Sequence, residues 1–111
     1  MANANVTIEG ILTFTSDGSP IPNENLTYTW QPCDSSGNPL SGTTPTNVPQ
    51  ATATNASGIG TSQAFQATIL SYVLLKTVFA GDPAAGAQPG AGSTFIQVTG
   101  NTTVKVSAVS G

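Results

Sequence analysis

The chain has 111 residues, of which 38 % are hydrophobic, so it is long enough for one buried core and too short for two domains. Only 6 % of the residues are charged, the formal net charge is −3, and both histidine and arginine are missing. Binding to nucleic acids or anionic membranes requires a basic surface, which Lys76 and Lys105 alone cannot form. We therefore expect no nucleic-acid binding and no membrane insertion.

The N-terminal region predicts a long strand. One parity holds the residues Val6, Ile8, Gly10, Leu12 and Phe14. This alternation is typical of a strand with one buried face, and a glycine in its middle indicates a bulge or a close approach of another backbone. No basic and apolar leader precedes the strand, so no signal peptide is expected. The residues before it are a candidate assembly segment that could add a strand to a neighbouring sheet: Ala2, Asn3, Ala4 and Asn5.

After a turn at residues 16–20, the stretch Leu26-Thr27-Tyr28-Thr29-Trp30 alternates strictly between apolar and polar residues. We expect this stretch to be the central strand of a small all-β core. The predicted structural core contains Phe14, Tyr28 and Trp30, with Trp30 packed beside the other two rings.

The middle of the chain is less regular. Residues 31–62 are rich in proline, glycine and small polar residues, which predicts a long loop with one or two short edge strands near Val48–Thr54. Residues 64–79 are the most hydrophobic segment. They fit a central strand, two strands joined near Ser71, or a helix, and their β-branched and aromatic residues favour strands.

The C-terminal third begins with a Gly/Pro/Ala loop at residues 82–93, which has no apolar anchor. Residues 95–99 and 102–109 are apolar-bearing runs on either side of Gly100-Asn101, a pattern that predicts a β-hairpin with a two-residue turn. The whole chain, residues 1–111, is therefore expected to form a single antiparallel β-sandwich with long loops at about 31–62 and 82–93.

The residue types also limit the chemistry. A Ser-His-Asp or Cys-His arrangement lacks its base, and a zinc site lacks its ligands, because the chain has no histidine and only Cys33 as a thiol. Glu9 and Glu24 are a formal but remote glycosidase pair, and Asp34 or Asp82 offers at most a weak calcium site. We predict no catalytic residue, no metal site and no cofactor. Four Asn-X-Ser/Thr triplets are attributed to composition: Asn5, Asn25, Asn55 and Asn101.

Two stretches carry a resemblance to a family. Residues 6–14 with 17–23, and Tyr28-Thr29-Trp30 with the turn at 36–42, resemble the opening of bacterial Ig-like surface modules. The resemblance covers about the first forty residues, and the chain departs from it in having no cysteine pair. It implies an Ig-like β-sandwich. Such modules are non-enzymatic pieces of cell-surface proteins and phage virions, which makes a capsid decoration, or cement, protein the expected function.

Assembly is the corresponding expectation for partners. The outward parity of the first and last strands carries Thr7, Ile11, Thr13, Thr103, Ser107 and Val109, with Glu9 and Lys105 as the only charges. Such faces favour packing against copies of the chain, a major capsid protein or another surface scaffold. The expected location is the virion surface. The alternative is a glycan-binding or filament/adhesion module outside the cell or on its surface.

Overall fold

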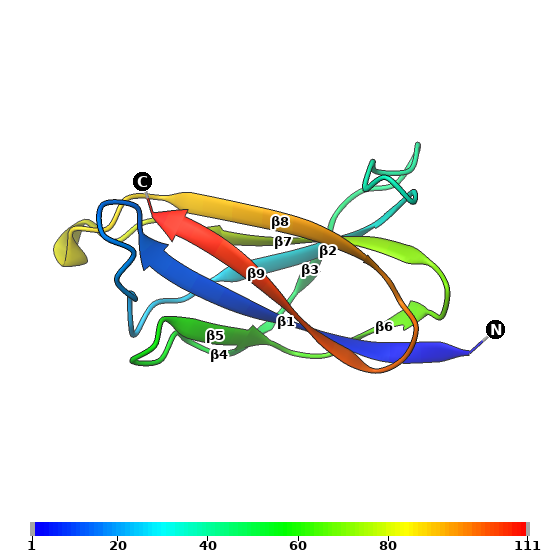
Figure 1. Ribbon diagram of the computed structural model, residues 1–111, viewed down its shortest axis with the longest axis horizontal. Coiled ribbons are helices and arrows are strands. Elements are labelled where there is room, and N and C mark those ends of the chain that lie inside the picture. Colours follow the sequence, from blue (N-terminus) through cyan, green and yellow to red (C-terminus); the bar gives the residue numbers. More distant parts are fainter. Residues whose placement is uncertain (1, 111) are drawn as a thin grey trace.

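The computed structural model describes residues 2–110, which form two β-sheets in an elongated body of 46 × 24 × 20 Å (Figure 1). Nine strands and one short 3-10 helix make up the described chain, and no α-helix is found within it. In chain order they are β1 Asn3–Phe14, β2 Thr27–Cys33, β3 Thr46–Val48, β4 Gln50–Thr52, β5 Ile59–Ser62, β6 Phe65–Thr68, β7 Tyr72–Phe79, η1 Pro83–Ala85, β8 Gly90–Gln97 and β9 Thr102–Ser110.

The strands divide into one mixed and one antiparallel sheet. In the five-stranded sheet, β1 pairs antiparallel with β5 and β6 and parallel with β9, and β4 pairs with β5. The other sheet has the order β3-β2-β7-β8 and is antiparallel throughout. The all-β prediction is confirmed, and the two sheets are compatible with a β-sandwich. The expectation of purely antiparallel pairing is wrong, because β9 runs parallel to β1.

The inward parity of β1 is buried as the alternation predicts. Val6, Ile8 and Leu12 have no solvent exposure. Gly10 lies on the same face, and a Cβ added there would be 2.7 Å from Leu26 Cδ1 and 3.1 Å from the Tyr28 ring. The glycine therefore allows the close approach between sheets that its position in the middle of the strand indicated.

The core is mainly aliphatic. Tyr28 is the largest of its fully buried side chains, whereas Phe14 and Trp30 are only partly buried and pack against its margin. The Trp30 ring stacks on Phe65, with 5.1 Å between ring centroids and an interplanar angle of 6°. The aromatic partner of Trp30 is thus Phe65, and Tyr28 is the only one of the three predicted core aromatics that lies in the centre.

The two less regular segments contain more strand than expected. The predicted edge strands near Val48 are β3 and β4, which flank Pro49 and belong to different sheets. β5 was missed, because its Ile-Gly-Thr-Ser sequence has little apolar character. Residues 64–79 adopt the two-strand alternative: β6 and β7 are joined by a turn in which Ser71 N–H donates to Thr68 O at 3.1 Å.

The predicted hairpin around Gly100-Asn101 is wrong. β8 pairs with β7 and β9 pairs with β1, so this turn connects the two sheets. The Asn5 N–H donates to Asn101 Oδ1 at 2.9 Å, which directs the chain towards β1. β8 and β9 still lie close together (Figure 1). The approach is so close that a Cβ added at Gly92 would overlap the Ser107 carbonyl. The predicted loop at 82–93 contains η1, and β8 already begins at Gly90.

The candidate assembly segment, residues 2–5, is part of this fold. Asn3, Ala4 and Asn5 begin β1 and pair in register with β6, Ala4 is buried, and Ile69 N–H donates to Ala2 O at 3.0 Å. Adding this segment to a neighbouring sheet along the edge that pairs with β6 would first require that ladder to open. An assembly surface elsewhere on the protein would leave this ladder intact.

Candidate functional site

The outer face of the five-stranded sheet has almost no net charge. Cross-strand pairing places Thr7 beside Thr103 and Glu9 beside Lys105. The two charges of this face are therefore neighbours and have opposite signs. β4 and β5 continue the face with a hydrogen bond of 2.7 Å between the Thr52 and Thr61 hydroxyls. We call this surface the neutral face: Thr7, Glu9, Ile11, Thr13, Thr52, Ile59, Thr61, Thr103, Lys105, Ser107 and Val109.

The composition of the neutral face suits contact with another protein. Ile11 and Ile59 are register neighbours, and the Val109 side chain is 44 % exposed. The remaining positions are mostly hydroxyl side chains, which both donate and accept hydrogen bonds. Burying such a surface removes few charges from water, so its desolvation cost is low compared with that of a charged face.

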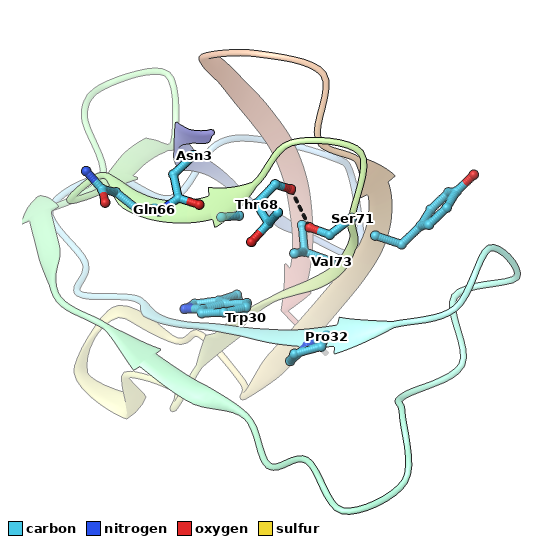
Figure 2. A pocket seen from close by; sticks show the side chains of 9 residues that line it. Asn3, Trp30, Pro32, Gln66, Thr68, Ser71 and Val73 are labelled. Atoms are coloured by element: carbon cyan, nitrogen blue, oxygen red, sulfur yellow. Dashed lines mark hydrogen bonds between the residues drawn. The ribbon is translucent and has the colours of Figure 1, made fainter. Parts of the chain in front are cut away.

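A second candidate site is an open cleft between the two sheets, which we call the cleft (Figure 2). Its volume is about 310 Å³. Figure 2 shows Asn3, Gln66 and Thr68 on one side and Trp30 and Pro32 on the other, with Ser71 near the turn. None of its lining residues is charged: Asn3, Trp30, Pro32, Gln66, Ala67, Thr68, Ser71, Tyr72 and Val73.

Two contacts make the walls of the cleft rigid. The Trp30 ring is held flat by its stacking on Phe65. On the other wall, Ser71 Oγ donates to Thr68 O at 2.6 Å and fixes the turn between β6 and β7. A fixed aromatic surface next to neutral polar groups is a typical composition for a small-molecule site.

The same turn contains an unusual residue, Leu70. Its φ is +74°, in the left-handed region, and its side chain is 61 % exposed. Its backbone is held in place, because Leu70 N–H donates to Val98 O at 2.6 Å and Gln97 Nε2 donates to Leu70 O at 3.3 Å. A leucine in this conformation is strained by about 1 kcal/mol or more, and its exposed side chain contributes little to the core.

The core itself contains two buried hydroxyls without hydrogen-bond partners, those of Tyr28 and Thr77. These residues are cross-strand neighbours on β2 and β7 and both contact the position of Gly10. Burial raises the pKa of Tyr28 to about 12. The Gly10 peptide acts on this pKa in the opposite direction, but it does not form a hydrogen bond of normal geometry with the hydroxyl.

The isolated carboxylates mainly hold turns. Asp17 accepts from Ser19 N–H and Asp34 from Ser36 and Asn38 N–H, and these backbone hydrogen bonds lower the pKa of both carboxyls. The pKa of Glu24 is raised by desolvation and by the neighbouring Asp82. Within residues 2–110 no three Cys, Asp or Glu side chains come together in a group that could hold a metal ion. The pair Glu9 and Glu24 is divided between the neutral face and the loop before β2.

Cys33 is buried at the end of β2. Its burial, followed by the nearby Asp34 charge, raises the pKa of the thiol. A raised pKa keeps the thiol protonated and therefore a poor nucleophile. Cys33 contributes to the packing of β2 against the following loop. Its backbone forms an isolated antiparallel β-bridge with Pro39.

Three of the four Asn-X-Ser/Thr asparagines have side chains that serve the fold. Asn55 Oδ1 accepts from Ser57 and Ile59 N–H, Asn101 Oδ1 accepts from Asn5 N–H, and Asn25 Oδ1 accepts from Gln50 Nε2.

Of the residues proposed from the sequence, the structure brings the outward residues of the first and last strands together on the neutral face. It leaves the candidate segment 2–5 paired with β6, and Asn3 of this segment lines the cleft. The alternation of the sequence indicated that Trp30 and Phe65 each point inward, but it did not indicate that they meet, because they are far apart in the chain. Among the described residues, no helix has the length and apolarity needed to cross a membrane. No family model, curated protein or solved structure matches the chain.

Proposed function

We propose that this protein is a non-enzymatic structural subunit of a virion surface, an Ig-like module that decorates or cements a phage capsid. The observation that carries the proposal is the neutral face, a hydroxyl-rich sheet surface without net charge that contains Ile11, Ile59 and Val109. Its partner is a larger protein shell. Within a shell, many copies lie close to one another, and surfaces without net charge do not repel each other.

The edges of the fold support the same function. β3 and β8 are the outer strands of their sheet, and within the described chain no further strand pairs with either of them in a ladder on its outer edge. Natural monomers commonly block such edges with lysine, proline or inward charges. β8 has the sequence Gly-Ala-Gly-Ser-Thr-Phe-Ile-Gln and contains none of these. Contact with a neighbouring protein would protect this edge.

The test introduces one charge on the neutral face. Ser107 is exposed on this face, whereas Ser93 is exposed on the outer face of the other sheet. Ser107→Lys should strongly reduce the number of copies on purified particles, and Ser93→Lys is the matched control, which should keep the copy number of the unchanged protein. Equal incorporation of both variants would contradict the neutral face as the shell contact.

A glycan-binding or adhesion module is the second candidate function. The cleft favours it, because a fixed tryptophan and neutral polar groups are combined there. The two functions are compatible on one protein, since the neutral face and the cleft have no residue in common.

A further inference from the structure

We propose that this protein carries tensile load along its long axis, with the parallel ladder between β1 and β9 as the element that bears the load. The load is a pull directed outwards at the start of β1 and at the end of β9. This function goes beyond the proposed attachment to a shell and does not depend on it.

The first and last strands of the described chain run side by side in the same direction. β1 and β9 pair in parallel over nine register positions, which begin at Val6 and end at Phe14 of β1. Because the strands are parallel, the start of β1 and the end of β9 lie towards opposite ends of the 46 Å body (Figure 1). A pull on these two points is therefore directed along the ladder, and it slides one strand past the other.

The direction of the pull decides how the hydrogen bonds between two strands break. When the strands slide, every bond of the ladder is stretched at once, and all of them break within a displacement of about one residue rise, ~3.3 Å. When the strands are peeled apart from one end, the pairs break one after another, and each broken pair lengthens the tether by roughly two rises, ~6.6 Å. The same bond energy then extends over nine such steps, so that peeling needs a much smaller force.

Both loaded strand ends are held by further contacts. Residues 3–6 at the start of β1 pair in register with β6. At the end of β9, Thr15 N–H donates to Ser110 O at 3.1 Å, and Ser110 Oγ donates to Gln88 O at 2.8 Å. These contacts oppose fraying of the strand ends, so the load reaches the whole ladder.

The other edge of β9 lies against the backbone of β8. A Cβ added at Gly92 would overlap the Ser107 carbonyl, and a Cβ added at Gly90 would overlap the Val109 carbonyl. The inward side chains of β9 belong to the hydrophobic core. Contacts on its second edge and on its inner face keep β9 aligned with β1 while the two ends are pulled, so the load acts on the ladder as shear.

Single-molecule force spectroscopy with two attachment geometries tests the proposal on the full chain. In the sliding geometry, the handles are fused to the N-terminus and the C-terminus. In the peeling geometry, the C-terminal handle stays and the other handle is attached through Ser16→Cys, in the turn directly after β1 and next to the end of β9. Cys33 is buried, so the new exposed thiol is the one that reacts.

We expect the rupture force at equal pulling speed to be about threefold higher or more in the sliding geometry than in the peeling geometry. Ser16 is exposed and the substitution exchanges an oxygen for a sulfur, so the variant should fold; equal urea midpoints of the variant and the unchanged protein are the control. A smaller ratio of the two forces would overturn the proposal, because the ladder would then not be the load-bearing element. Neither result bears on capsid attachment.

Discussion

The hydroxyl of Tyr28 offers a direct test of the packing between the two sheets. It is completely buried, has no hydrogen-bond partner, and would lie 3.0 Å from a Cβ added at Gly60 of the facing sheet. A buried hydroxyl without a partner costs about 1–3 kcal/mol relative to its hydration in water. Tyr28→Phe removes this oxygen and keeps the ring, so it should raise the free energy of unfolding by about 1 kcal/mol.

The assay is chemical and thermal unfolding of the two proteins side by side. For a domain of this size, 1 kcal/mol corresponds to an increase of about 4 °C in Tm. Tyr72→Phe is the control, because Tyr72 is only half-buried and lies on β7 near the cleft. A Tyr28→Phe variant that is less stable by about 1 kcal/mol would refute the argument, since the hydroxyl must then be satisfied by a buried water.

The pH dependence of stability gives a second readout of the same group. The pKa of Tyr28 is about 12 in the folded protein and about 10 when unfolded. Between these values the folded state holds a proton that the unfolded state has lost, so stability falls as the pH rises from 10 to 12. The loss is at most about 2.7 kcal/mol. It should be missing in Tyr28→Phe, and an identical alkaline loss in both proteins would exclude Tyr28 as its source.

Four further predictions concern separate parts of the molecule. Gly92→Ala should destabilise the protein by about 3 kcal/mol or prevent folding, because the new methyl group would overlap the Ser107 carbonyl, whereas Gly100→Ala has open space and should change little in urea unfolding. Leu70→Asn should raise Tm and stabilise by about 0.5–1 kcal/mol, since asparagine tolerates a positive φ; a loss of stability would show that the leucine side chain contributes to packing. Trp30→Ala should cost about 3 kcal/mol in unfolding free energy because its stacking on Phe65 is lost, and an emission spectrum of Trp30 like that of free indole would contradict this stacking. Excess chelator should leave Tm unchanged, and a large decrease would reveal a metal that the fold needs.

The sequence predicted the faces of the regular strands well. Val6, Ile8 and Leu12 are buried in β1 and Leu26 and Tyr28 are buried in or before β2, because a period of two places alternate residues on one side of a strand. The same alternation predicted the outward residues that now form the neutral face. Local patterns are sufficient where burial on one face is the main constraint.

Strand pairing was less predictable. Gly100-Asn101 correctly marked a turn, but a turn does not determine which strand each flank pairs with. β7 was available to β8, and β1 was available to β9 along nine register pairs. The inward glycines of β8 let its backbone approach Ser107 closely, and this function of Gly92 depends on the position of a distant strand.

The cleft could not be predicted for a similar reason. Trp30 had the correct parity for the core, yet it lies at the margin because β6 turns away towards β7 after a short ladder with β1. The approach of Phe65 to Trp30 is a long-range contact, and Asn3 reaches the cleft only through its register pairing with Thr68. Nothing in the neighbouring sequence of these residues indicates that they meet.

The most direct test of the central claim is the location of the protein itself. Antibodies against the folded chain, used in immunogold electron microscopy of particles released by cells that carry its gene, would show where it acts. The proposed function predicts gold label on the outside of the capsid and a fixed ratio of this protein to the major capsid protein by quantitative mass spectrometry. Particles free of the protein, with the label confined to the cell envelope or the cell interior, would contradict it.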